Sequence, residues 1–391
     1  MVDRHKRSAA KQARRDARRS KARRGRAAGQ DAPEEVPLVD EVREALAGGD
    51  PMDLLGLVSM VIVATAPQPE LPRAPETEEI LGLDELVDAF IDVRVAETTA
   101  LLAVLGELVM DDDVLRDRCR REVETRTDDL PPWLAALAQT TVHEAVRMTH
   151  VLGDGDEVLL GVRLADGGEM TCAIHIDHLE MSEVKDAFFV PNSLDAVVDI
   201  ARASNTDPDT SFVDLDLSEA RARLEAALEQ HLAMFPPADS DTWPACRPLV
   251  QWLTRLMPDD FTGDVAQRHS THTEALVDRF FASVAGMAFD DVHHRALLDV
   301  CIDEGTGDAL RWSAMRLRQL LGDVVADPGA IPVDPQLNVP ELLRAFVPFA
   351  HAESGIRQEL TAEALAAIDE SADGYRELVL EDAEFPGLSD D

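Results

Sequence analysis

Residues 157–165, EVLLGVRLA, and residues 169–177, EMTCAIHID, decide the fold class of this chain. Both segments are rich in Val, Leu and Ile, which favour β-strands. The three residues between them, Asp166-Gly167-Gly168, are typical of a tight turn. The pattern therefore predicts a β-hairpin.

Two registers of this hairpin can be compared. A two-residue turn would place Val162 opposite Thr171 and Leu164 opposite Glu169, so that apolar side chains face polar ones. A three-residue loop matches every apolar pair, and we predict it with a glycine in the left-handed position of the loop. The expected pairs are Val158 with Ile176, Leu160 with Ile174, Val162 with Cys172 and Leu164 with Met170.

The sequence on either side of the hairpin is mostly helical in its apolar spacing. Residues 184–190 predict a further strand, and residues 146–152 are a candidate for another. We therefore predict a mainly α (α+β) protein, with helical domains and a small antiparallel β-meander inserted around residues 145–190. The helices are expected at residues 38–47, 52–65, 83–110, 114–127, 131–145, 193–203, 218–235, 249–257, 273–286, 290–304, 308–321, 341–352, 362–371 and 374–380.

A chain of 391 residues has room for two or three packed units. The Pro-rich acidic segment APQPELPRAPETEE, at residues 66–79, is the clearest candidate linker. We predict a basic arm at 1–30, two short helices within 31–65, the linker at 66–79, a helical domain carrying the β-meander at 80–236 and a C-terminal helical domain at 237–391.

Charge is segregated along the chain. Residues 1–30 contain twelve Lys and Arg and two acidic residues, a net charge of +10. Because the whole chain carries −39, residues 31–391 carry −49. A basic arm on an acidic body is typical of a protein that seeks an anionic partner.

The arm lacks large apolar and aromatic side chains between Val2 and Val36. It therefore offers neither an apolar face for a membrane nor rings that stack on single-stranded bases. We expect it to be disordered or an isolated helix that contacts nucleic acid or the ribosome through phosphates; a solvated tail, or one folded back on the acidic body, is the alternative. The residues expected to bind are Arg14, Arg15, Arg18, Arg19, Lys21, Arg23 and Arg24.

Residue usage argues against several classes of protein. Lys185 is the one lysine outside the arm, and no Gly-rich loop precedes it, which argues against phosphate-loop ATPases, kinases and Schiff-base enzymes. The four cysteines lie more than fifty residues apart, so they predict neither a disulfide framework nor a zinc site. The longest apolar run, residues 54–66, is too short for a membrane span. We expect a cytoplasmic protein with no cofactor.

The polar face of the hairpin holds a candidate metal site. The predicted register places Glu157 opposite Asp177, and His175 shares a strand face with Asp177. Opposed carboxylates repel, so a cation is expected between them: protonated His175, Arg163 or a metal ion. Glu157, His175 and Asp177 are therefore candidate metal ligands, with a solvated strand end as the alternative.

No motif identifies a reaction. No serine stands in a nucleophile-elbow motif, and Cys172 and His175 are expected on opposite faces of one strand. Residues 205–216, NTDPDTSFVDLD, resemble a calcium loop in their acids but lack its glycine and final glutamate, so we expect an acidic loop leading to a helix. The leading expectation is a binding or regulatory protein without catalysis. The alternative is a metal-dependent hydrolase at the hairpin.

Overall fold

The computed structural model describes residues 38–66, 81–233, 242–263, 270–325 and 331–384. The chain divides into two compact units, residues 1–54 and residues 55–391. In the first unit, α2 (Leu38–Gly48) buries Val42 and is followed by Gly49 in the left-handed conformation, with φ of 77°. The next helix, α3 (Pro51–Thr65), begins after Asp50, whose carboxylate accepts from the backbone N–H of Met52 at 3.0 Å. Both predicted helices are confirmed.

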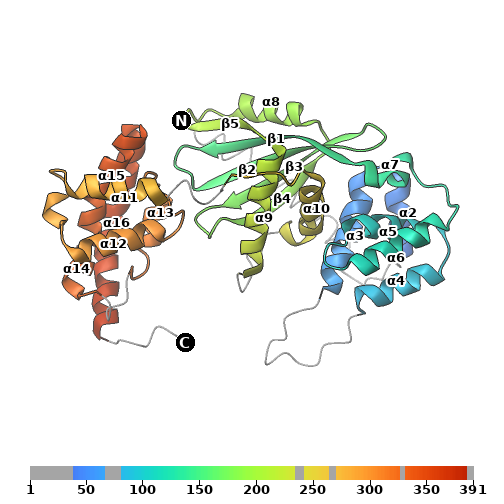
Figure 1. Cartoon of the computed structure of the whole chain (residues 1–391), viewed down its shortest axis with the longest axis horizontal. Helices are drawn as coiled ribbons and strands as arrows, with labels where there is room; N and C mark the ends of the chain where they lie inside the picture. Colours follow the sequence, from blue (N-terminus) through green and yellow to red (C-terminus); the bar gives the residue numbers. More distant parts are fainter. Residues whose placement is uncertain (1–37, 67–80, 234–241, 264–269, 326–330, 385–391) are drawn as a thin grey trace, which may run out of the picture. The chain divides into compact units, whose positions relative to one another are not determined.

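The second unit contains an antiparallel sheet of five strands in the order β4-β3-β2-β1-β5 (Figure 1). This confirms the predicted fold class, a mainly helical chain with a β-meander inserted in its middle. Two strand predictions needed correction: residues 141–145 begin a strand rather than end a helix, and residues 210–215 form an edge strand inside the expected acidic loop. The strands are β1 (Thr141–His150), β2 (Gly155–Arg163), β3 (Glu169–Asp177), β4 (Glu183–Val190) and β5 (Thr210–Leu215).

The hairpin register differs from the predicted one by two residues. The loop has the predicted length of three residues, but these are Ala165 to Gly167 rather than Asp166 to Gly168, because the Leu164 N–H donates to the Gly168 carbonyl at 2.8 Å. Gly167 holds the left-handed position, with φ of 89°. The predicted pairs were wrong: Val158 lies opposite Ile174, Leu160 opposite Cys172, Val162 opposite Met170 and Glu157 opposite His175.

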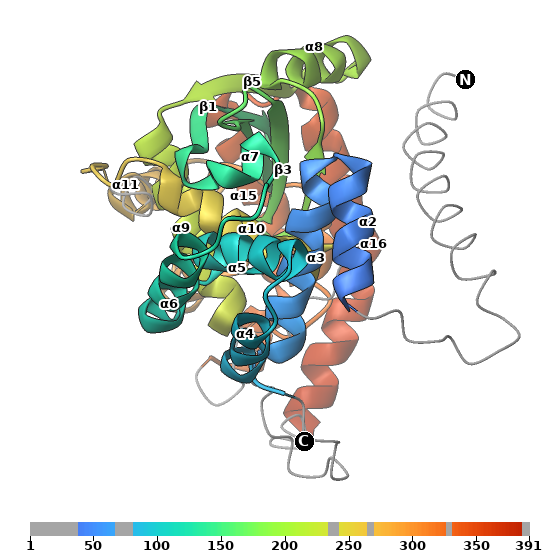
Figure 2. The same ribbon diagram turned by 90° about the vertical axis from the view of Figure 1, so that its right-hand side faces the viewer.

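Both faces of the sheet are covered by helices. Leu159 and Ala173 point to one face, where they pack with Leu194 and Val198 of α8. The neighbouring residues in sequence point to the other face, on which α9 and α10 contact β4 and β1. Figures 1 and 2 show α8 on one side of the sheet and α9 and α10 on the other. Burial on both faces explains why the hairpin strands are more continuously apolar than a half-exposed strand.

The helices of the second unit lie before and after the sheet in sequence, except α8, which lies between β4 and β5. The predicted helix at 83–110 is two helices, with a break at residues 93–95. Those predicted at 362–371 and 374–380 form one helix. The bounds are α4 (Leu83–Asp92), α5 (Ala96–Leu108), α6 (Asp113–Glu124), α7 (Pro132–Ala135), α8 (Leu194–Ser204), α9 (Leu217–Ala233), α10 (Trp243–Leu256), α11 (Ser270–Phe281), α12 (Val292–Asp303), α13 (Ala314–Leu320), α14 (Val333–Leu337), α15 (Val339–Ser354) and α16 (Gln358–Glu384), with short 3₁₀ turns at Leu137–Gln139 and Met287–Phe289.

The C-terminal helices have their own apolar core, which contains buried residues from Leu276 to Val379. Its centre is aromatic: Phe346 makes edge-to-face contacts with Phe280 and Trp312, at ring-centroid distances of 4.9 and 5.9 Å. The core lies among α11 to α16, while α10 packs on β4, β1, α9 and α5. The domain boundaries expected from the sequence stay predictions.

Among the described helices, none combines the length and the apolar character needed to cross a bilayer.

Candidate functional site

One end of the sheet collects ionisable side chains from strands β1 to β4 and from the neighbouring loops. Because the strands are antiparallel, β1 and β3 end where β2, β4 and β5 begin. We call this region the polar end of the sheet. Its members are Arg147, His150, Asp154, Asp156, Glu157, His175, Asp177, His178, Lys185, Asp207 and Asp209.

The three predicted metal ligands all lie at the polar end, but in a different arrangement from the one expected. Glu157 faces His175, with Oε1 3.1 Å from Nδ1, and Asp177 lies opposite Gly155. The expected repulsion between Glu157 and Asp177 across the hairpin was therefore an error of register. Asp177 instead forms an ion pair with Lys185 and accepts from the backbone N–H of Leu179 at 3.0 Å.

These contacts shift the pKa values of His175 and Lys185. The contact of the His175 imidazole with the accepting carboxylate of Glu157 is the main reason why the pKa of His175 is raised, and burial opposes it. The bond to Asp177 raises the pKa of Lys185, so the lysine stays charged. A metal ion would have to displace Lys185 and share Glu157 with His175. The metal-dependent hydrolase stays a prediction, which metal analysis of the purified protein would test.

Asp156 is a buried carboxylate at the polar end, with 5% of its surface exposed. Burial alone would raise its pKa, but hydrogen bonds from His178 and Thr149, together with the charges of His178 and Arg147, lower it to about 2. The Oδ2 atom lies 3.2 Å from His178 Nε2 and 3.5 Å from Arg147 Nη1. Asp156 is therefore ionised at neutral pH.

A second candidate metal group joins β1 to the loop before β5. Ligand atoms of His150, Asp207 and Asp209 lie within 4.8 Å of one another, the one such group in the described ranges. However, His150 Nδ1 accepts from the backbone N–H of Leu152 at 3.2 Å, which leaves the proton on Nε2, 3.4 Å from Asp207. Asp209 is bound by Arg357, whose Nε lies 2.8 Å from Oδ1. The geometry therefore favours an ion-pair network over a metal centre.

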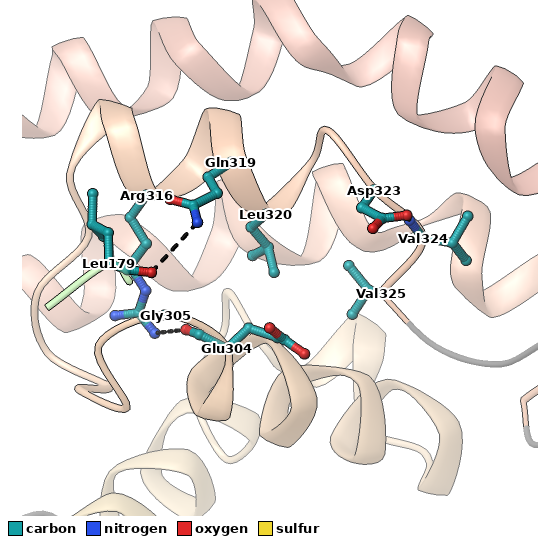
Figure 3. Close-up of a pocket in the computed structure, with 9 residues that line it drawn as sticks. All are labelled: Leu179, Glu304, Gly305, Arg316, Gln319, Leu320, Asp323, Val324 and Val325. Carbon is teal, nitrogen blue, oxygen red and sulfur yellow. Dashed lines mark hydrogen bonds between the residues drawn. The ribbon is translucent and has the colours of Figure 1, made fainter. Parts of the chain in front are cut away.

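A pocket of about 210 Å³ lies between the β3–β4 turn and the C-terminal helices (Figure 3). Gln319 Nε2 donates to the backbone carbonyl of Leu179 at 3.4 Å. Arg316 also lines the pocket, but its guanidinium donates to backbone carbonyls, including Ile302 at 2.8 Å and Glu304 at 3.2 Å. Because these carbonyls engage the guanidinium, Arg316 is a structural cation. The ionisable residues in the lining are Glu304, Arg316 and Asp323, and the lining contains no Ser, Cys, Thr or His.

The predicted nucleic-acid-binding residues fall outside the described residues. This applies to residues 1–30 as a whole and to nearly all of the expected linker at 66–79. The partners expected for the arm, nucleic acid or the ribosome, stay predictions.

Sequence reasoning missed two groupings at the polar end. Asp156 and His178 are separated by twenty-one residues, and the loop acids join His150 only because β5 pairs with β1. The acidic residues of 205–216 were evident in the sequence, but the edge strand that this segment contains was not. Comparison with protein-family models, characterised proteins and solved structures gave no significant match.

Proposed function

We propose that this chain is a cytoplasmic binding or regulatory protein whose basic arm, residues 1–30, contacts nucleic acid without sequence specificity. The observation that carries the proposal is the charge segregation: +10 in the arm against −49 in the remainder. Arginine side chains grip phosphates through paired N–H donors, whatever the base sequence.

The contacts of the body support this role for the arm. Lys185 is bound to Asp177, and Arg295 bridges Asp278 and Asp290 at 2.9 and 2.8 Å. Such cations are already neutralised by acids of the body. A polyanion that approaches the protein therefore meets its strongest attraction at the arm.

Long-range repulsion sets the expected strength of binding. The body carries −49 and repels a polyanion, while the arm attracts it. Each phosphate neutralised on duplex DNA contributes about −0.9 to the slope of log affinity against log salt. With roughly half of the twelve basic residues engaged, the slope should be about −5. Affinity should be weak at physiological salt and should rise steeply as salt falls.

Fluorescence anisotropy across a salt series tests the proposal, with random duplex DNA and structured RNA as probes. The full chain should bind both, and a chain lacking residues 1–30 should bind neither. Substitution of Arg14, Arg15, Arg18 and Arg19 by Gln should reduce the magnitude of the slope. A matched control changes Arg43, Arg318, Arg344 and Arg376 of the body to Gln.

The truncated chain should keep its melting temperature, since the arm has almost no apolar surface to bury. A flat salt response, or equal binding by the truncated chain, would contradict the proposal. A large fall in melting temperature after truncation would show instead that the arm is part of the folded structure.

A further inference from the structure

His178 connects a buried carboxylate to a serine hydroxyl. Its Nε2 lies 3.2 Å from Asp156 Oδ2, and its Nδ1 lies 2.9 Å from Ser182 Oγ. The backbone N–H of His178 donates to the carbonyl of Asp154 at 2.9 Å and so fixes the start of the turn. Serine, imidazole and carboxylate are thus in series, which is the arrangement of a nucleophile, a base and a group that orients the base.

The neighbours of His178 decide which tautomer its neutral form adopts. Asp156 is ionised and accepts hydrogen bonds only, so the neutral imidazole carries its proton on Nε2 and donates it to Asp156. Nδ1 then presents a lone pair, and Ser182 Oγ–H donates to it. The serine proton therefore already points at the atom that would accept it.

The backbone at Ser182 is strained. Met181 and Ser182 both adopt left-handed conformations, with φ of 55° and 61°, in the turn closed by the hydrogen bond from Glu183 N–H to the Glu180 carbonyl at 3.1 Å. Gly or Asn would occupy these positions at lower cost, as in most turns of this kind. Strain of this type gathers at functional sites, where the surrounding structure holds it. Here it places a half-buried serine beside the imidazole.

We propose that Ser182, His178 and Asp156 form a nucleophilic site for acyl transfer, with carboxylic esters as the substrate class. Ser182 Oγ attacks the ester carbonyl carbon while its proton passes to His178 Nδ1. The C–O bond to the alcohol then breaks, and the alcohol leaves with that proton. Water attacks the acyl-serine, gives a proton to Nδ1, and releases the carboxylic acid as the proton returns to Ser182. Asp156 orients the imidazole and stabilises its charged form.

This site goes beyond the proposed function and is independent of it. Its three residues come from β2 and the β3–β4 turn, and none of them belongs to residues 1–30. Loss of nucleic-acid binding on removal of residues 1–30 would leave the esterase proposal intact, and failure of the esterase proposal would leave the arm unaffected.

A fluorophosphonate probe tests the site on the full chain. Serine attack on phosphorus expels fluoride, and the adduct is located by intact mass and peptide mapping. We expect one adduct per chain, at Ser182, and hydrolysis of p-nitrophenyl acetate. Ser182→Ala should abolish both, and His178→Gln should slow labelling by about 100-fold or more. The control Ser211→Ala, an exposed serine on β5, should label at the wild-type rate.

The Ser182→Gly variant distinguishes loss of the nucleophilic hydroxyl from loss of folding. Glycine adopts positive φ at no steric cost, so this variant should melt no lower than the wild type and should still lack the adduct. Absence of labelling in the wild-type chain would overturn the proposal. An adduct that survives in the Ser182→Ala and Ser182→Gly variants would overturn it equally.

Discussion

Asp156 of β2 and His178, just beyond β3, meet at the polar end of the sheet, with Oδ2 and Nε2 3.2 Å apart. Asp156 lies opposite Ile176 in the register, so His178 is two residues beyond the paired position. The backbone turns after Asp177 and carries the imidazole back to the carboxylate. This contact lowers the pKa of Asp156 against the opposing effect of burial.

The first prediction concerns acid stability. The pKa of Asp156 falls from 3.8 in the unfolded chain to about 2 in the folded protein, so its charge contributes stability above pH 4 that is lost as pH falls toward 2. The shift corresponds to roughly 2 kcal/mol. Asp156→Asn should lower stability at pH 7 by about this amount and flatten the loss between pH 4 and 2. Urea unfolding at several pH values measures both, with exposed Asp195→Asn as control.

A second prediction concerns Glu157 and His175. Because Glu157 raises the pKa of His175, the pair stabilises the fold below the unfolded pKa of about 6.5, and this contribution is lost as pH rises through the folded pKa. Glu157→Gln should lower the pKa of His175 in an NMR titration. Glu169→Gln, at the opposite end of β3, should leave it unchanged. An unshifted His175 in Glu157→Gln would show that the pair does not set this pKa.

His351 should make the C-terminal helices sensitive to mild acid. It is buried with 1% exposure, accepts from the backbone N–H of Trp312 at 3.2 Å, and has a pKa lowered by burial to about 4. The contribution of His351 to the free energy of unfolding is therefore fully present above pH 6.5. It is lost as pH falls toward 4 and amounts to about 3 kcal/mol. His351→Gln cannot titrate and should show a flatter pH dependence of urea unfolding. An equal dependence in the two proteins would assign the effect to other groups.

Arg316 should be indispensable to the C-terminal helices. It is 2% exposed, lies over Trp312 at 3.9 Å from the ring centroid, and donates to five backbone carbonyls. Arg316→Met would leave these acceptors buried without a donor, and we expect a loss of about 3 kcal/mol or more in urea unfolding. Arg318→Met, which removes an exposed ion pair with Glu370, should cost less than about 0.5 kcal/mol.

Gly161 is a packing requirement of the sheet. The register of β1 shifts at His143, and a Cβ at Gly161 would lie 3.3 Å from His143 Cε1 and 3.2 Å from Leu194 Cβ. Gly161→Ala should therefore destabilise the protein by about 1–3 kcal/mol. Gly374→Ala, in α16 with no atom within 4 Å of the new Cβ, should stabilise it by up to about 1 kcal/mol. Thermal unfolding of both variants checks the contrast.

The sequence pattern predicted the side-chain faces of the hairpin but not the paired residues. The faces of Leu160, Val162, Cys172 and Ile174 were predicted correctly, because a slip of two residues leaves every side chain on its face. The partners were wrong, because both registers pair apolar residues throughout. The two registers differ in where the loop begins. Because Leu164 pairs with Gly168, the three-residue loop begins at Ala165.

The candidate site was predicted as a region and not as a set of partners. Glu157, His175 and Asp177 do lie together at the polar end, where the alternation of the strands placed them. Their pairing with one another, with Lys185 and with further side chains depends on the register and on β4. The Ser182 site was invisible for a similar reason, since no motif marks a serine in a turn as the partner of a histidine four residues earlier.

By itself, the sequence determined the fold class, most helices, the length of the hairpin loop and the charge segregation. These follow from composition and from spacing within one segment, which local physics governs. The tertiary structure decided the fifth strand, the break between α4 and α5, the hairpin partners and the Asp156–His178–Ser182 series. Each of these depends on contacts between segments far apart in the chain or on competing local geometries of similar energy, and only packing and hydrogen bonding in the folded protein select among them.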